Sequence, residues 1–446
     1  MQKSLLFFAL RIGSTAFASA WSFLLAYTLV RLMGLENYAF LATVIAFAAL
    51  VLQADLGISI RLFSRMRQNF LDPTSGSRED LRSATATALW AYSGAAVLAT
   101  AIFAAAVHFW NLGPAEHRLA IILLFAGSVL PLPWMVLRVA VNACDLYVVT
   151  EAIDCARRGA LLLITGGLAF GLPLLEYAIG FVLLWAVALL VLFTLAQRRL
   201  DLFHGISVRR GWHVLREDSA GLIASAKLSG SDFLMSIFPY YVIPLMHPEA
   251  AALVAFDMFY KVTRFGLTSY LTVTETLLPH QTRAYHTANY QTMSRTTMLS
   301  FALCSIPCIV GSAIIYFFGD RFFGTLLGHP GIVSPGMQVA ICAMLFFMML
   351  QVASGAVMAG IGELAPLARR ASITLAVMLL FSLGAGLAEW SIDHFVAGYV
   401  ILFGCEAVSY FLLLLSVLHR LRRAARAGAG GVPAGPLGEG ELGASR

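Results

Sequence analysis

Apolar segments long enough to cross a lipid bilayer recur from the first residues of the chain to about Leu418. A helix needs about 20 apolar residues to span the hydrocarbon core. Because lipid offers no partners for unpaired backbone groups, such segments must be helical. Only 12% of the 446 residues are charged, whereas a soluble domain carries about 25%. The sequence therefore predicts an all-α integral membrane protein.

The apolar pattern predicts about twelve transmembrane helices in two six-helix bundles with a central cleft. Little more than Pro173 separates the fifth and sixth, so ten or eleven spans remain an alternative. The predicted helices cover residues 6–31, 38–62, 82–107, 116–142, 157–174, 177–197, 219–245, 251–278, 296–318, 333–359, 369–388 and 394–418. The predicted domains are an N-terminal bundle at 1–200, a basic linker at 201–218, a C-terminal bundle at 219–419 and a disordered basic tail at 420–446.

The two bundles resemble a duplication. Leu32-Met33 and Glu36 in the first half match Leu245-Met246 and Glu249 in the second, which aligns helices one and two with helices seven and eight. Parallel repeats of this kind have an axis along the membrane normal and place the substrate path between the halves. We therefore expect the cleft to lie between these four helices.

Lysine and arginine are distributed unevenly between the two sides of the predicted membrane. Most lie in the loops of one side, and the loops of the other side hold only Arg31, Arg118 and Arg321. Positive loops face the cytoplasm, so both termini are expected there. Ala18-Ser19-Ala20 resembles a signal-peptidase site, but Arg11 interrupts the apolar region before it, and an uncleaved first helix is favoured.

The motifs of common membrane enzymes are absent from the sequence. It contains neither a Gly-x-x-x-x-Gly-Lys-[Ser/Thr] phosphate-binding loop nor His-Glu-x-x-His. Its six cysteines lie in or beside apolar helices, without the partners of a metal site. The predicted outer loops are too short to form a catalytic domain outside the membrane. The sequence predicts a transporter that is not an enzyme, with no cofactor, no bound metal and no nucleic-acid partner.

Ten ionisable residues fall at bilayer depth. Each costs at least about 2.5–3.5 kcal/mol to insert, so each is by default a functional candidate. Asp55, Arg138 and Glu275 lie near helix ends and could reach the interface instead. The bases and the acids are equal in number, so any positive cleft depends on how they segregate. The ten are Arg11, Asp55, Arg138, Lys227, Asp232, Asp257, Lys261, Arg264, Glu275 and Glu406.

The predicted eighth helix carries the most informative charges. Asp257, Lys261 and Arg264 fall on one face, and the first two are one turn apart, so Arg264 is the surplus cation. A guanidinium binds phosphate oxygens in pairs and stays charged at any physiological pH. The face therefore predicts a cationic wall for an anionic substrate. The alternative is a structural network that also includes Asp232.

Gly34-x-x-x-Tyr38, a long apolar helix and then Asp55-Leu56-Gly57 resemble the start of bacterial polysaccharide (oligosaccharide) flippases. This family belongs to the superfamily of multidrug, oligosaccharidyl-lipid and polysaccharide exporters. The motif covers the first 60 residues, and the layout of twelve spans in two halves covers the whole chain. The sequence departs from the family in having Ala39 where glycine usually follows the tyrosine.

The resemblance implies a flippase of the bacterial inner membrane. Its substrate would be a polyprenyl-pyrophosphate-linked oligosaccharide, moved to the outer leaflet by alternating access and driven by an ion gradient. The partners implied are this anionic lipid-linked glycan, membrane lipid, and the glycan polymerase and export machinery of cell-surface polysaccharide biosynthesis. The alternatives are an exporter of lipid II or of drugs from the same superfamily, an integral-membrane glycan polymerase or ligase, and a scaffold that does not transport.

Site residues follow from the motif and from depth in the membrane. Only Gly34, Tyr38, Asp55 and Gly57 carry over from the family motif. Asp55 is expected to pair with Arg11 or with an arginine at 61, 65 or 67 in one state of the transport cycle. The predicted substrate-binding cations are Arg11, Lys227, Lys261 and Arg264, and the predicted gating or coupling acids are Asp55, Asp232 and Asp257.

Overall fold

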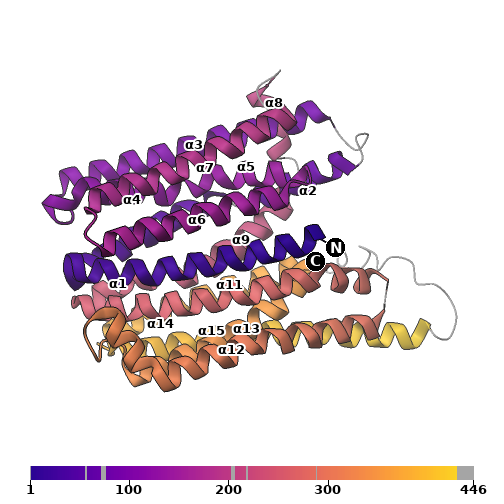
Figure 1. Cartoon of the computed structure of the whole chain (residues 1–446). Coiled ribbons are helices and arrows are strands. Elements are labelled where there is room, and N and C mark those ends of the chain that lie inside the picture. Colours follow the sequence, from indigo (N-terminus) through magenta and orange to yellow (C-terminus); the bar gives the residue numbers. More distant parts are fainter. Residues whose placement is uncertain are drawn as a thin grey trace.

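The structure is a computed structural model of the chain, and it describes residues 2–55, 58–71, 77–201, 206–216, 219–287 and 289–428. Every regular element in these ranges is a helix. Figure 1 shows the helices of the first half above those of the second half, with α1 (Gln2–Leu52) between them. Both described ends of the chain lie at the same end of the molecule (Figure 1).

The first half continues from α1 through a series of long and short helices. They are η1 (Gln53–Asp55), α2 (Ile58–Leu71), α3 (Arg78–Phe109), η2 (Ala115–His117), α4 (Arg118–Val129), α5 (Pro131–Ala143), α6 (Tyr147–Ala169) and α7 (Leu174–Leu200). After α8 (Val208–Arg216), the second half comprises α9 (Ser219–Ile237), α10 (Pro239–Met246), α11 (Ala250–His286), α12 (Tyr290–Leu327), α13 (Pro335–Gly360), α14 (Leu364–Leu387) and α15 (Ile392–Gly428).

Each of the twelve predicted spans has a helical counterpart. Among the described residues, eight helices are long and apolar enough to cross a membrane, and one of these is the part of α1 from Ala9 to Leu52, which contains the first two predicted spans. Prolines divide the fourth span into α4 and α5, and the seventh into α9 and α10. Three predicted spans are not among these eight helices: α6, α9–α10 and α11. These three hold most of the buried charges, which is why their composition is less apolar.

Several predicted boundaries are wrong. The eighth and ninth predicted helices end at 278 and 318, whereas α11 continues to His286 and α12 to Leu327. The second predicted helix continues to residue 62, but α1 ends at Leu52, and α2 resumes at Ile58 after η1. The fifth begins at Tyr147 instead of 157, because the charges in its first half are paired within the protein and need no aqueous loop. The last helix continues to Gly428, so the first part of the predicted disordered tail is helical. Residues 429–446 lie outside the described residues.

Gly34 forms the bend between the two spans of α1. Its backbone angles are φ 78° and ψ 171°, a region that is essentially restricted to glycine and costs other residues about 1–3 kcal/mol. A Cβ at this position meets no other atom within 4 Å, so strain is the only expected penalty. The glycine of the sequence motif is thus explained by the backbone: it lets the chain reverse direction between helices one and two.

We expect Gly34→Ala to destabilise the folded protein by about 1–3 kcal/mol through this backbone strain alone. Thermal unfolding of the purified protein in detergent measures the loss. Gly94→Ala is the matched control, because Gly94 lies within α3 and its added Cβ also meets nothing within 4 Å. The control should be neutral or slightly stabilising, since alanine favours helix. Equal melting temperatures for Gly34→Ala and the wild type would contradict the explanation.

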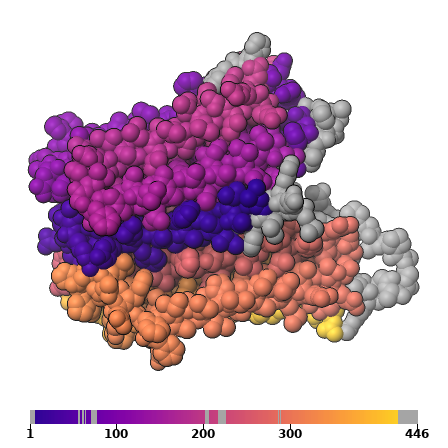
Figure 2. All heavy atoms as spheres, in the orientation of Figure 1, coloured from indigo at the N-terminus to yellow at the C-terminus, as the bar shows by residue number. Residues whose placement is uncertain are grey.

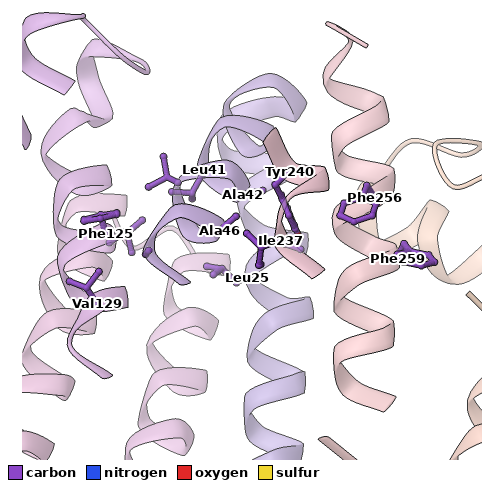
Figure 3. Packing of buried hydrophobic residues seen from close by; sticks show 14 of the residues in the cluster. Leu25, Leu41, Ala42, Ala46, Phe125, Val129, Ile237, Tyr240, Phe256 and Phe259 are labelled. Carbon is purple, nitrogen blue, oxygen red and sulfur yellow. The ribbon is translucent and has the colours of Figure 1, made fainter. Parts of the chain in front are cut away.

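The two halves share α1 as their common surface. This helix packs against α6 in the first half and against α11 in the second. Figure 3 shows Leu25, Ala42 and Ala46 of α1 close to Ile237 and Tyr240 of the second half. In the space-filling view, the first half lies above α1 and the second half below it (Figure 2). Side chains on the α11-facing side of α1 are therefore placed at the interface where a substrate path is expected.

Candidate functional site between the two halves

A polar cluster joins the halves close to the bend of α1 at Gly34. Tyr38 of α1 donates a hydrogen bond to Asp257 of α11, and Tyr240 of α10 donates a second one to the other carboxylate oxygen at 2.7 Å. Lys261 forms an ion pair with Asp257, and its Nζ lies 2.7 Å from the Tyr38 hydroxyl. We call these four residues the interhalf cluster. It satisfies both oxygens of a carboxylate that is only 3% exposed.

The interhalf cluster gives the motif tyrosine a specific role in this structure. Tyr38 is 3% exposed and connects residues that lie more than 200 positions apart in the sequence. The four residues of the cluster line a cavity of about 100 Å³, together with mostly apolar residues of α1 and Ile237. The predicted pairing of Asp257 with Lys261 is confirmed. The hydrogen bonds of the pair to the tyrosines Tyr38 and Tyr240 were not predicted.

A second contact closes the interface at the same end of the molecule, on the other side of the bend at Gly34. Arg31 of α1 donates hydrogen bonds to the backbone carbonyls of Thr325 and Leu326, at 2.8 and 3.0 Å. These carbonyls belong to the last turn of α12, where helical carbonyls lack intrahelical partners. Phe23 of α1 meets Phe322 of α12 edge to face, with 5.7 Å between ring centroids. Polar and aromatic contacts therefore hold the two halves together at this end.

One face of α11 is turned toward α1 along most of its length. Asp257 and Lys261 contact Tyr38, and Glu275, more than four turns later, lies 3.6 Å from the guanidinium of Arg11. Arg264 is seven residues after Asp257 and eleven before Glu275, which places it on the same face. Its side chain is exposed, and the described residues contain no acidic partner for it. Arg264 is therefore a free cation on the side of α11 that faces the other half.

Inside the first half, four arginines converge on two buried acids. Glu151 is 1% exposed and lies 2.8 Å from Arg138 and 3.6 Å from Arg11. One turn further along α6, Asp154 is within 2.5 Å of Arg157 and 2.8 Å of Arg158. We call this set the arginine network, formed by Arg11, Arg138, Arg157, Arg158, Glu151 and Asp154. With four bases and two acids, it carries a formal surplus of positive charge.

The arginine network borders a cavity of about 410 Å³. Arg138, Arg157 and Arg158 line it, and Arg157 also stacks on the ring of Trp185 at 3.7 Å. The cavity shares Trp21, Ile45 and Ala49 with the smaller cavity lined by the interhalf cluster. The two spaces are thus adjacent, on either side of these three α1 side chains. An anionic group in the larger cavity would meet the guanidinium groups of Arg138, Arg157 and Arg158.

The sequence missed Arg157 and Arg158 because both were assigned to the predicted cytoplasmic end of helix five. Glu151, Asp154, Arg157 and Arg158 fall at intervals of three and four residues, which puts them on one helical face. This spacing is visible in the sequence and is a signal for a paired helical segment. The number of charged residues in this segment favours a loop when composition alone is considered. Opposite charges at helical spacing neutralise each other, however, and are compatible with a helix inside the membrane.

The described hydrogen bonds and ion pairs of Asp257 do not include Asp232, so a structural network on α11 would not extend to this acid. Asp232 interacts electrostatically with Glu406 of α15, deep in the second half. Glu406 is 2% exposed and accepts a hydrogen bond from Gln351 at 3.2 Å. One oxygen of Asp232 and one of Glu406 lack a hydrogen-bond partner in the described structure. Two of the five acids in the spans are therefore kept away from the face of α11 that meets α1.

Asp55 is held by neutral groups. The backbone and hydroxyl of Ser59 donate hydrogen bonds at 3.1 and 2.5 Å, and the Tyr92 hydroxyl lies at 2.8 Å. Arg11, one of its predicted partners, is engaged by Glu151 and Glu275 instead. Asp55 thus connects the end of η1 to Ser59 in the first turn of α2 and to Tyr92 of α3. An exchange of partners during transport stays a prediction, as does the role of Gly57, which lies outside the described residues.

Lys227 is exposed on α9. Its contribution to a cationic cleft stays a prediction. Across the described ranges, no group of three or more histidine, cysteine or acidic side chains could hold a metal ion. The candidate site therefore consists of the interhalf cluster, the arginine network and Arg264.

Comparisons with known proteins identify the fold. No protein-family model and no curated protein matches the chain. Among solved structures, an inward-facing multidrug resistance MATE family transporter of the MOP superfamily superposes with a TM-score of 0.68 at 14% identity, covering 94% of this chain and 99% of that one. An outward-facing structure with the same description gives 0.60 at 13% identity, covering 94% and 95%.

A third similar structure is a MOP superfamily transporter from Pyrococcus furiosus, whose binding pocket is described as having reverse polarity that suggests a different function. It gives a TM-score of 0.64 at 14% identity and covers 94% of this chain and 96% of that one. Similarity at this level of identity establishes the architecture alone. The chain is a multi-pass helical membrane protein with the fold of MATE family transporters of the MOP superfamily.

Proposed function

We propose that the protein is an alternating-access transporter that moves an anionic, lipid-linked substrate across the membrane. In finer detail, the substrate proposed is a polyprenyl-pyrophosphate-linked oligosaccharide, delivered to the outer leaflet for cell-surface polysaccharide biosynthesis. The support for transport is the fold, which solved transporters share over nearly the whole chain. The support for an anionic substrate comes from the charges.

The observation that carries the proposal is the surplus of cations around the two adjoining cavities and on the face of α11 that meets α1. The arginine network contributes four bases and two acids, and the interhalf cluster contributes one of each. Arg264 adds an exposed guanidinium, and Glu275 adds one exposed acid that Arg11 binds. Half-buried Asp232 and buried Glu406 lie elsewhere in the second half. A pyrophosphate, with paired oxygens for guanidinium groups, fits such a surface.

A drug exporter is the second candidate, because several of the solved structures with this fold are multidrug transporters. A cationic drug needs an unpaired acid at the binding surface. Asp257 is the acid nearest the cavity at the interface, but Lys261 and two tyrosines already occupy both of its oxygens. The charge pattern therefore favours an anionic substrate over a cationic one.

Coupling to an ion gradient is proposed at Asp232 and Glu406. Two interacting carboxylates repel each other when both are ionised, and a bound proton or cation relieves that repulsion. Each has one oxygen with no hydrogen-bond partner among the described residues. Asp232 lies on α9 and Glu406 on α15, so occupancy of the pair could alter the packing of these helices. The candidate coupling site is thus separate from the cations proposed to bind substrate.

The deciding experiment is to delete the gene and determine the sidedness of lipid-linked sugars in inverted and right-side-out membrane vesicles. Full-length lipid-linked oligosaccharide confined to the cytoplasmic leaflet is the expected result. Single repeat units on the outer leaflet would instead indicate a polymerase, because translocation would be intact. Normal lipid-linked sugars combined with sensitivity to cationic drugs would overturn the proposal in favour of drug export.

A further inference from the structure

A long apolar groove lies on the outside of the first half. Helices α4 and α5 form its floor, and α3 and α7, which both pack on them, form its walls. The groove has a volume of about 870 Å³. Trp90, Val97 and Leu190 line it and are 64%, 70% and 62% exposed. It therefore opens outward, onto the surface that meets the membrane.

The groove has the length of a lipid chain. Its lining on α3 extends from Leu89 to Ala104, which at about 1.5 Å per residue is roughly 22 Å. One leaflet of the hydrocarbon core is about 15 Å thick, half of the total. An acyl chain that spans one leaflet is therefore short enough to lie entirely within the groove.

A basic pocket continues the groove at one end. It has a volume of about 350 Å³ and lies between α2, the start of α3 and the ends of α5 and α7. Its nearest residue on α3 is Thr85, one turn before Leu89 of the groove. Three guanidinium-bearing residues line it: Arg78, Arg82 and Arg199. The basic pocket and the apolar groove thus follow one another along the same three helices, α3, α5 and α7.

The arginines of the basic pocket are poorly neutralised. Arg82 lies 3.9 Å from Asp201, which is half exposed, and its buried Nε has no hydrogen-bond partner in the described structure. Arg78 donates to the backbone carbonyl of Arg199 at 3.3 Å. Neither Arg78 nor Arg199 has an acidic partner among the described residues. The nearby Asp145 is already paired with Arg67 at 2.6 Å.

The position of Cys144 shows that these charges converge. Burial and the negative charge of Asp145 raise the pKa of this thiol, while the positive charges of Arg199, Arg78 and Arg67 act in the opposite direction. Cys144 lines the pocket, so at least two of the pocket arginines act on one point in it. A phosphate at that point would meet several guanidinium donors at once.

We propose that this surface is a binding site for an anionic phospholipid, with the phosphate among Arg78, Arg82 and Arg199 and one acyl chain in the apolar groove. The lipid belongs to the leaflet at the basic end of the molecule, the end expected to face the cytoplasm. The chemistry requires an acidic head group and a hydrocarbon chain, as in phosphatidylglycerol. This site is independent of the proposed transport function.

The occupant is a resident membrane lipid rather than the lipid tail of a transported substrate. Leu130, Pro133 and Leu137 of α4–α5 face the groove, whereas Trp134 and Arg138 line the cavity of the arginine network. The groove and the cavity therefore lie on opposite faces of α5, with the helix between them. A tail in the groove would be cut off from a head group at the interface of the halves.

Trp90 provides a direct test. The full-length protein is placed in phosphatidylcholine nanodiscs that contain brominated phosphatidylglycerol or brominated phosphatidylcholine, and the quenching of Trp90 is taken as the difference between wild type and Trp90→Phe. We expect half-maximal quenching at about a tenfold lower fraction of brominated phosphatidylglycerol, because each arginine near the surface attracts anionic lipid. The double variant Arg78→Gln/Arg199→Gln should lose this preference.

Two matched controls make the test specific. Arg209→Gln removes an exposed arginine of α8 that does not line the pocket, and it should keep the preference. Ala101→Phe fills the groove and should reduce quenching by both lipids, whereas Ala105→Phe, on the same helix outside the groove, should not. Equal quenching by the two lipids in the wild type would overturn the proposal. Displacement of brominated phosphatidylglycerol by an equal fraction of polyprenyl pyrophosphate would assign the site to the substrate instead.

Discussion

Replacing Arg264 by glutamine is expected to slow transport by about 10- to 100-fold while the protein still folds and reaches the membrane. Arg264 is exposed on the face of α11 that meets α1, without an acidic partner among the described residues. Its removal leaves no buried charge behind, so stability should change by no more than about 0.5 kcal/mol. A hydrogen bond to a charged group contributes about 1.5–3 kcal/mol, and every 1.4 kcal/mol or so is a factor of ten.

The rate at which lipid-linked oligosaccharide reaches the outer leaflet, in vesicles from the complemented deletion strain, measures the effect. Arg264→Lys should recover part of the rate, since it keeps the charge but loses the planar fork of donors. Arg283→Gln is the control, because Arg283 is exposed on the same helix beyond Glu275. Wild-type transport by Arg264→Gln at normal protein level would remove Arg264 from the substrate path and favour a structural role for the charges.

The sequence predicted the helices well because lipid imposes a simple constraint. A span must be apolar and long, and both properties are visible in any window of 20 residues. The same rule failed at α6, where Glu151, Asp154, Arg157 and Arg158 resemble a loop by composition but form ion pairs on one helical face. Local composition records how much charge a segment carries. It does not record whether that charge has partners on other helices.

The site was predicted only as far as local spacing allows. The pairing of Asp257 with Lys261 follows from their separation by one turn and is confirmed. Tyr38 was known from a motif, but its hydrogen bond to Asp257 depends on how the two halves pack. The segregation of Asp232 and Glu406 away from the interface likewise needs the three-dimensional arrangement. The proposed mechanism depends on contacts between the halves. These contacts cannot be predicted from a single sequence.

Replacing Asp257 by asparagine is expected to destabilise the protein by about 3–5 kcal/mol, the cost of leaving one member of a buried ion pair alone. The Lys261 side chain is only 17% exposed, and the two tyrosine hydroxyls cannot neutralise it. The double variant Asp257→Asn/Lys261→Met should recover most of this loss, because removal of both charges leaves none unpaired. Thermal unfolding in detergent separates the three proteins.

The exposed pair Glu363–Arg420, at 3.4 Å, provides the control within the same chain. Glu363→Gln should cost at most about 1 kcal/mol, since exposed ion pairs contribute little. If Asp257→Asn is no less stable than Glu363→Gln, the interhalf cluster does not hold the buried charges as described. If instead the double variant is stable but transports slowly, the pair acts in transport rather than in folding. In that outcome, the hydrogen bond between Tyr38 and Asp257 must break and reform as the protein alternates between its two conformations. This would be the function of the tyrosine in the sequence motif.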